Sequence, residues 1–393
     1  MPMICARFIG MLSCCSLALA VTAAAAQEAK PAAKAGLAEK LQPFVESHSL
    51  AGAVVLAASK EKVLDLETVG YSDVAAKTPI APDSLFWIAS MSKPITGAAM
   101  MILVDEGRVS LDDPVEKHLP EFRELWLAAE QDKDHILLKR PARAVTVRDI
   151  LSHTSGLAFK SPLEQPTLDG LPLRDTVRGY TMMPLLHEPG SKWMYSNAGI
   201  NTAGRIIEVV SGMPFEDFLD QKLFQPLGMK DTTFWPNEEQ VARLAKSYKP
   251  NADKTGLEET TITSLIYPLA DRRQRYPMPG GGLFSTAGDL AQFCRMVLRG
   301  GELDGRRYLS EEAVKQMTSK QTPDSLPDGY GVGWSTNFGG FGHGGAYSTN
   351  MNIDPTRDLI TIFLVQHAGF PNDGNKSHEV FKKAAEEMFG GKE

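Results

Sequence analysis

The sequence predicts an α+β fold, in which N- and C-terminal segments form an antiparallel sheet flanked by terminal helices, with an all-helical domain inserted between them. Two observations predict it: strand patterns cluster toward both ends of the chain, and the middle shows mainly helical patterns. The 393 residues are enough to bury the core of one large domain. We assign residues 27–85 and 280–393 to the α/β part and residues 86–279 to the helical part.

Residues 1–26 are typical of a secretory signal peptide. Arg7 supplies a positive charge, an apolar run from Phe8 to Val21 follows, and Ala24-Ala25-Ala26 fits a cleavage site. The run is too short for a transmembrane anchor, and no later segment is long and apolar enough; an uncleaved N-terminal anchor is the alternative. We therefore expect a periplasmic or secreted mature chain, cleaved after Ala26, with no membrane span.

The mature chain begins with helical spacing over residues 37–46. Residues 52–58 and 63–69 then predict two strands of a hairpin. An apolar helix follows over residues 90–106 and ends at Gly107. We expect the hairpin to form the N-terminal half of the sheet.

The middle of the chain carries few strand signals. We expect helices over residues 147–151, 198–211 and 215–223, and an irregular segment over residues 159–184 that is rich in proline and glycine. Residues 248–278 form a long connection, which predicts a lid or a wall of a site.

The C-terminal part returns to strand patterns. A helix over residues 286–298 comes first, with Thr286 and Asp289 at capping-box spacing. It contains Cys294, the only cysteine after residue 26, which we interpret as a buried apolar residue. The remaining predicted elements are strands over residues 331–336, 348–353 and 359–366 and an amphipathic helix over residues 378–389.

The charge composition argues against one class of function. The formal net charge is −7, and lysine and arginine form no basic patch. A nucleic-acid surface needs a concentration of positive charge. We therefore expect a small-molecule substrate and no nucleic-acid partner, and we make no prediction of oligomeric state.

Ser90 and Lys93 are the first candidate catalytic pair. Residues three apart on a helix share a face, so the amine of Lys93 can reach the hydroxyl of Ser90. Serine becomes a nucleophile when a base takes its proton, and a desolvated lysine can be that base. The alternative is a surface lysine that follows a helix cap.

Two later stretches carry groups that fit such a pair. Tyr195 can transfer protons, and Asn197 can orient a substrate carbonyl. His343-Gly344-Gly345-Ala346 precedes a predicted strand, where the backbone can approach a ligand and donate an N–H. The alternatives are a core tyrosine with a capping asparagine, and a glycine turn with an incidental histidine.

The three motifs together resemble class C β-lactamases and penicillin-binding-protein-like serine hydrolases, a family that includes carboxylesterases. Ser90-Met91-Ser92-Lys93, Tyr195-Ser196-Asn197 and His343-Gly344-Gly345 follow the family's order and rough spacing. Flanking segments over residues 107–122, 146–157 and 280–293 are also similar. The likeness spans nearly the whole of residues 27–393, and it implies the two-part fold derived above.

The resemblance implies a role for each residue of the motifs. Ser90 would be the nucleophile, Lys93 the general base, Tyr195 the proton shuttle and Asn197 a substrate-orienting residue. The backbone N–H groups of Ser90 and Ala346 would form the oxyanion hole, and His343, Gly344 and Gly345 would contact the substrate. No metal or organic cofactor is implied, in agreement with eight histidines that show no metal-ligand spacing.

One departure from the family pattern bears on the substrate. β-Lactamases usually carry Lys-Thr-Gly at the third motif, where this chain has His343-Gly344-Gly345. A histidine is mostly neutral at pH 7, so substrates with a carboxylate should bind less well, and protonation below about pH 6.5 should improve their binding. We therefore expect a carboxylesterase acting on small esters through an acyl-enzyme. The alternatives are a β-lactamase or D-Ala-D-Ala-type peptidase, and a non-catalytic binding protein of the same fold.

A histidine between serines, in Ser152-His153-Thr154-Ser155-Gly156, is a second place to look for catalysis. No Gly-x-Ser-x-Gly motif surrounds either serine. We interpret the segment as a turn.

Overall fold

The computed structural model describes residues 36–337 and 339–391. The predicted signal peptide lies outside these residues. Among the described residues, no helix has both the length and the apolar character needed to span a membrane.

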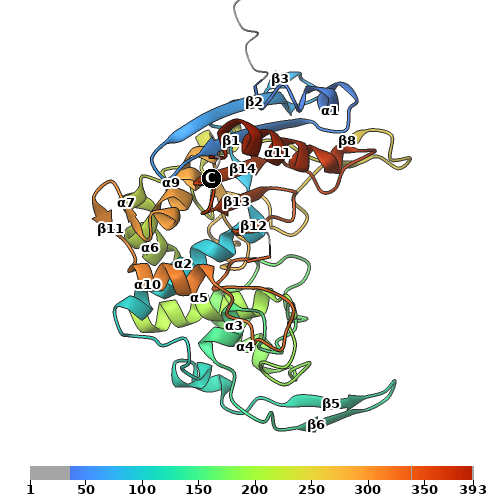
Figure 1. Ribbon diagram of the computed structural model, residues 1–393. Helices are drawn as coiled ribbons and strands as arrows, with labels where there is room; N and C mark the ends of the chain where they lie inside the picture. The colour runs from blue at the N-terminus through green and yellow to red at the C-terminus, as the bar shows by residue number, and fades with distance from the viewer. Residues whose placement is uncertain (1–35, 338, 392–393) are drawn as a thin grey trace, which may run out of the picture. The chain divides into compact units, whose positions relative to one another are not determined.

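A six-stranded antiparallel sheet joins the two ends of the described chain (Figure 1). Its strand order is β12-β13-β14-β1-β2-β3, so N- and C-terminal strands meet where β1 pairs with β14, with Val54 opposite Leu364. This confirms the predicted α+β class. The strands are β1 (Gly52–Ala58), β2 (Val63–Asp73), β3 (Thr78–Pro79), β12 (Phe341–Gly344), β13 (Asn350–Asp354) and β14 (Leu359–Leu364).

Helices cover both faces of this sheet, which explains why every residue of β1 is buried. Alternate side chains of a strand point to opposite faces. Val55 packs with Phe381 of α11 (Ser377–Phe389), next to α1 (Gln42–Glu46). Val54 belongs to the larger cluster that includes α9 (Ala287–Leu298). Cys294 of α9 is fully buried there, as predicted, with its sulfur 3.8 Å from that of Met351.

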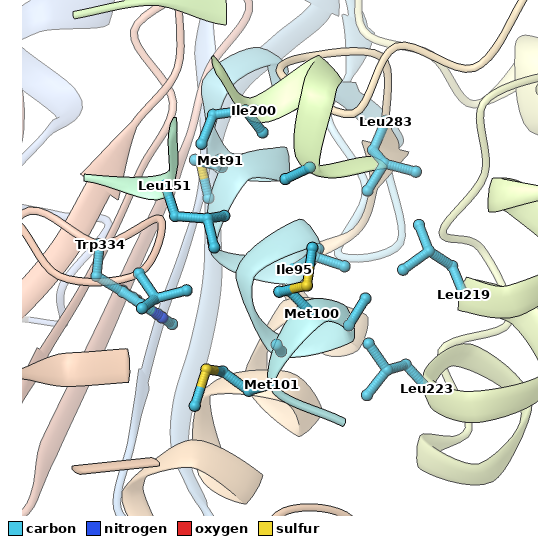
Figure 2. Packing of buried hydrophobic residues seen from close by; sticks show 14 of the residues in the cluster. Met91, Ile95, Met100, Met101, Leu151, Ile200, Leu219, Leu223, Leu283 and Trp334 are labelled. Carbon is cyan, nitrogen blue, oxygen red and sulfur yellow. The ribbon is translucent and has the colours of Figure 1, made fainter. Parts of the chain in front are cut away.

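The inserted segment packs around one central helix, α2 (Ser92–Asp105). Its residues from Ser92 to Leu103 are buried, so the helix is enclosed by the protein on all sides. Figure 2 shows Ile95 and Met100 of α2 among side chains from surrounding elements, including Leu151, Leu219 and Trp334. The other helices are α3 (Val147–Leu151), α4 (Leu173–Thr181), α5 (Asn197–Ser211), α6 (Phe215–Leu219), α7 (Gln225–Leu227), α8 (Glu238–Ala242) and α10 (Glu311–Thr318).

Short elements connect these parts. The 3₁₀ helices are η1 (Ala89–Met91), η2 (Val115–Lys117), η3 (Pro120–Phe122) and η5 (Gly374–Lys376), and Asp220–Phe224 is π-helical. Pairs of short strands are β4 (Phe86–Trp87) with β9 (Phe284–Ser285), β5 (Leu127–Gln131) with β6 (Ile136–Lys139), β7 (Ser247–Pro250) with β8 (Leu257–Thr260), and β10 (Glu302–Leu303) with β11 (Arg306–Arg307).

The prediction of a strand over residues 331–336 is wrong. These residues form a loop, and the edge strand of the sheet is β12. Gly333 has a φ of 79°, and a Cβ there would lie 2.5 Å from the carbonyl oxygen of Lys93. The apolar pattern of this segment therefore comes from packing against α2, as a loop that needs glycine at the point of closest approach.

The middle of the chain also holds elements that we did not predict. The segment over residues 159–184, expected to be irregular, contains α4. The hairpins β5–β6 and β7–β8 lie in the part expected to have few strands. Figure 1 shows β5–β6 projecting from the body at the bottom of the view. All four residues of β6 are exposed, so no buried face imposed an alternating pattern on its sequence.

Candidate active site

Ser90 lies where a short strand turns abruptly into α2. The preceding strand β4 is paired with β9, and the indole N–H of Trp87 donates to the carbonyl of Gly281 at 2.8 Å. Ala89 then adopts a φ of 46°, which a non-glycine residue rarely takes. The turn leaves Ser90 partly exposed at the start of the helix. Such strained residues cluster at functional sites, which is a first indication that this turn has a function.

The second serine of the motif has a structural task. The hydroxyl of Ser92 donates to the carbonyl of Ala89 at 2.7 Å and accepts from the N–H of Leu283 at 3.2 Å. It is fully buried. Ser92 therefore fixes the turn that presents Ser90.

The amine of Lys93 is fully buried and lies at the centre of the site. Its Nζ is 3.0 Å from Oγ of Ser90, 2.7 Å from Oδ1 of Asn197 and 2.5 Å from the carbonyl oxygen of Gly280. In the described part of the chain it forms no ion pair with a carboxylate. Burial without a counter-charge disfavours the ammonium form, so the pKa of Lys93 is lowered well below its usual value.

These contacts determine how the N–H groups and the lone pair of a neutral Lys93 amine are oriented. It has two N–H donors and one lone pair. The oxygens of Asn197 and Gly280 can only accept, so they take the two N–H groups. The lone pair is left facing the hydroxyl of Ser90, which then donates to it. This is the arrangement of a general base beside a nucleophile.

Tyr195 lies on the other side of the same amine. Nζ of Lys93 is 4.7 Å from the centroid of its ring. Burial raises the pKa of Tyr195 to about 12, and a hydrogen bond with Ser90 acts in the opposite direction. The phenol therefore keeps its proton at neutral pH and can give it to a leaving group.

Asn197 is positioned by the start of α5. Ser196 caps the helix, accepting from the N–H of Gly199 at 3.3 Å. Asn197 is the first helical residue, with its oxygen on Lys93. One turn later, Oδ1 of Asn201 accepts from the N–H of Gly280 at 2.9 Å, and so holds the carbonyl that meets Lys93. Asn201 is a buried contributor that the sequence reasoning missed.

The third motif lies on the edge strand β12, which contains His343 and Gly344. The chain was expected to form a strand only after it. A Cβ on Gly345 would lie 2.5 Å from the carbonyl oxygen of Ile88, so only glycine allows this edge to approach the Ser90 turn. Ala346 follows at an exposed position, and among the described residues its N–H meets no acceptor.

The expectation that His343 gains a proton just below neutral pH is wrong. The ring is buried, its Nδ1 donates to the carbonyl of Gly344 at 2.7 Å, and its Nε2 accepts from the hydroxyl of Tyr330 at 2.8 Å. Burial, then the amine of Lys93, lowers the pKa of His343 to about 3, against the opposing hydrogen bond to Gly344. The histidine is a neutral part of the strand edge.

A cavity of about 370 Å³ adjoins Tyr195 and His343. Its lining includes the aromatic residues Trp193 and Tyr330 and the polar residues Asn337 and Asn352. Its only lysine or arginine side chain within the described residues is Lys382 of α11, whose Nζ is 3.9 Å from a carboxylate oxygen of Glu386. The cavity can therefore hold an apolar group close to Tyr195.

The long connection over residues 248–278, for which we expected a lid or a wall of the site, packs against the strand that precedes Ser90, and none of its residues lines the cavity. Its Ile262, Leu265 and Met278 pack with Trp87 and Tyr347. Within this connection, the guanidinium of Arg275 is buried and its Nε lies 2.6 Å from a carboxylate oxygen of Asp169. That ion pair fixes the segment to the rest of the helical part.

The turn at Ser152–Gly156 forms as predicted, but it is closer to the site than we inferred. His153 is buried, and its ring centroid lies 4.5 Å from that of Tyr195 and 4.5 Å from that of Tyr330. The signal was the lone histidine in an otherwise small-residue turn. No cluster of three or more His, Cys, Asp or Glu side chains suited to a metal ion occurs in residues 36–337 and 339–391.

The comparison with protein families identifies the fold. The model of the family described as Beta-lactamase matches residues 37–385. The chain belongs to this family. It is thus a member of the β-lactamase and penicillin-binding-protein group of serine hydrolases, as the resemblance implied.

Relatives within the family differ in their named activities. Esterase EstB of Burkholderia gladioli is 31% identical over 264 residues, which cover 61% of this chain and 64% of the esterase. A putative D-alanyl-D-alanine carboxypeptidase of Escherichia coli K12 is 27% identical over 336 residues, covering 76% and 73% of the two chains. The solved structure of EstCE1, a hydrolase with promiscuous acyltransferase activity, has a TM-score of 0.72 and 25% identity, covering 89% and 98%.

Proposed function

We propose that this protein is a carboxylesterase that hydrolyses small uncharged esters through an acyl-enzyme on Ser90. One observation carries the proposal. The buried amine of Lys93 is held by Asn197 and Gly280 and lies 3.0 Å from the hydroxyl oxygen of Ser90. A lowered pKa keeps it available as a base.

The proposed acylation assigns a step to each group. Oγ of Ser90 attacks the ester carbonyl while its proton passes to Nζ of Lys93. The N–H groups of Ser90 and Ala346 bind the developing oxyanion. The alcohol leaves with the proton of Tyr195, which Lys93 then replaces. In deacylation, water enters in place of the alcohol and the same transfers run in reverse, which releases the acid and restores Ser90.

Preference for an uncharged ester follows from the edge strand and the cavity. His343 is neutral, so β12 presents no positive side chain to a substrate carboxylate. The adjoining cavity is lined in part by the aromatic side chains of Trp193, Tyr195 and Tyr330. The likeness to esterase EstB supports the same substrate class.

A β-lactamase or D-Ala-D-Ala-type peptidase is the second candidate, and Lys382 favours it. Its side chain lines the cavity, and 29% of it is exposed. An ammonium there can bind the carboxylate of a peptide or a β-lactam. The E. coli relative named as a carboxypeptidase supports this candidate.

A fluorophosphonate probe tests the acyl-enzyme chemistry. We expect wild type and Ser155→Ala to be labelled at stoichiometric dose, and Ser90→Ala to remain unlabelled. Ser155 is a suitable control because its buried hydroxyl accepts from the N–H of Leu157, away from Lys93. An unlabelled wild type would favour the non-catalytic binding protein.

Substrate class is tested with p-nitrophenyl butyrate and a chromogenic cephalosporin. The esterase proposal expects the ester to be the better substrate by kcat/KM, and Lys382→Gln to leave that value within about twofold. Lys383→Gln is the matched control, since Lys383 is 76% exposed and does not line the cavity. Faster cephalosporin hydrolysis, lost in Lys382→Gln alone, would establish the second candidate.

We also propose that the protein is exported to the periplasm or beyond. The proposal rests on the composition of residues 1–26. N-terminal sequencing of the exported protein should start at Gln27. Recovery of the full chain in the cytoplasm would contradict it.

A further inference from the structure

His153 is held in an unfavourable backbone conformation directly beneath the site. Its φ is 63°, in the left-handed region that non-glycine residues rarely adopt. Only 1% of the residue is exposed. The N–H of the next residue, Thr154, donates to the carbonyl of Asp149 at 2.9 Å and helps to fix the turn after α3. Such a conformation persists where surrounding contacts impose it.

His153 forms hydrogen bonds with the residues immediately before and after Tyr195. Its carbonyl oxygen accepts from the N–H of Met194 at 2.8 Å. Its ring Nδ1 accepts from the N–H of Ser196 at 3.2 Å. The backbone is therefore held on both sides of Tyr195 by a single residue more than forty positions earlier in the chain.

The ring of His153 also packs on the side chain of that tyrosine. The two ring centroids are 4.5 Å apart at an interplanar angle of 49°. On another side the ring meets Tyr330, again at 4.5 Å, and Tyr330 in turn donates to His343. The histidine thus links the second and third motifs through packed rings.

Hydrogen bonding determines the tautomer of His153. Because Nδ1 accepts from a backbone N–H, the ring proton is on Nε2. Nε2 is buried and has no hydrogen-bond partner among the described residues. Burial, then the nearby Lys93 and His343, lowers the pKa of His153 well below its usual value. The ring is neutral and has no acceptor to pass a proton to, so its contribution is geometric.

We propose that His153 is a positioning residue that fixes the Tyr195 hydroxyl toward Ser90 and Lys93. The inference rests on the proposed function, because it concerns the proton that Tyr195 transfers. Displacement of a catalytic group by about 1 Å costs up to about a hundredfold in rate. A tyrosine held at both flanking N–H groups and against its ring cannot drift in this way.

Two substitutions separate the parts of the contact. His153→Phe keeps an aromatic ring but removes the acceptor for Ser196. His153→Asn keeps an oxygen near the position of Nδ1, and asparagine tolerates a positive φ. We expect His153→Phe to lower kcat about tenfold to a hundredfold with KM within about twofold, and His153→Asn to recover most of that loss. Equal losses in both variants would overturn the inference.

A double-variant cycle with Tyr195→Phe gives the decisive readout. If His153 acts through the tyrosine hydroxyl, adding His153→Phe to Tyr195→Phe should change kcat by less than about twofold. A purely structural residue would lower kcat by the same factor in both backgrounds, and that result would overturn the inference while leaving the proposed function intact. A wild type that neither reacts with the probe nor hydrolyses esters would overturn both.

A measurement on the unmodified protein guards against variants that fail to fold. In ¹⁵N-labelled wild type, the His153 ring should show a proton on Nε2, and its pKa should lie below that of a free histidine. A proton on Nδ1, or a pKa at or above the usual histidine value, would overturn the inference.

Discussion

The Nζ of Lys93 lies 2.5 Å from the carbonyl oxygen of Gly280, a residue 187 positions later in the chain. One turn along α2, the hydroxyl of Thr96 donates to the carbonyl of Pro279 at 2.8 Å. The segment that leads from the helical part back to the sheet is therefore attached to α2 at two successive carbonyls. This attachment holds the amine at Ser90 with no carboxylate partner in residues 36–337 and 339–391, so burial acts on its pKa unopposed.

A neutral buried lysine makes stability depend on pH. Between its lowered pKa in the folded protein and the usual lysine pKa, the unfolded chain binds a proton at Lys93 that the folded chain does not, so stability rises with pH in that window. Relative to Lys93→Met, wild type should therefore be more stable at pH 9 than at pH 7. Urea unfolding at the two pH values measures the difference.

The control for that experiment is Lys383→Met, because the side chain of Lys383 is 76% exposed. Its stability relative to wild type should be the same at pH 7 and pH 9. A flat difference for Lys93→Met as well would mean that the folded protein holds a charged lysine, and Lys93 would then not be the base.

Tyr195→Phe should affect esters according to their leaving group. The phenol keeps its proton because its pKa is about 12, so it can protonate a departing alkoxide. We expect kcat for an ethyl ester to fall about 10²- to 10⁴-fold. A p-nitrophenyl ester should lose much less in acylation, since its phenolate leaves without a proton. Pre-steady-state release of both alcohols measures the effect, and equal losses would show that Tyr195 is no acid.

Substrate preference should not respond to pH through His343. With a pKa of about 3, the ring stays neutral from pH 5 to pH 8. The ratio of kcat/KM for a succinate half-ester to that for a neutral ester should therefore be constant over this range, within about twofold. His343→Gln provides the comparison. A ratio that rises tenfold toward pH 5 in wild type and stays flat in His343→Gln would restore the charge interpretation.

The buried ion pair between Asp169 and Arg275 should be essential for stability. Both side chains are at most 2% exposed, and Arg275 also donates to the carbonyls of Phe234 and Leu269. Arg275→Met leaves a buried carboxylate unpaired, which costs about 3–5 kcal/mol. Arg174→Met removes an exposed pair with Asp175, which solvent screens, and should lower the free energy of unfolding far less. Urea midpoints compare the two, and similar values would contradict the prediction.

Hydrophobic patterns in the sequence predicted those helices and strands that bury one or both of their faces. Residues 52–58 form β1 at the predicted bounds, since a central strand covered on both sides needs a continuous apolar run. The helix over residues 147–151 also has the predicted bounds. The exposed strand β6 and the loop over residues 331–336 were not predicted correctly, because burial is not arranged there with the period of a strand.

The sequence by itself determined the fold class and the residues of the three motifs, because periodic burial and motif spacing are local properties of the chain. Only the tertiary structure decided the protonation states of the motif residues. Burial without a counter-charge is what lowers the pKa of Lys93, and burial is also the main reason why the pKa of His343 is lowered. The residues that contact the motifs come from distant segments. Gly280 accepts from Lys93, and His153 accepts from the N–H of Ser196, and no local pattern connects either residue to the motifs. Protonation depends on solvent exclusion and on neighbouring dipoles, which exist only once the chain has folded.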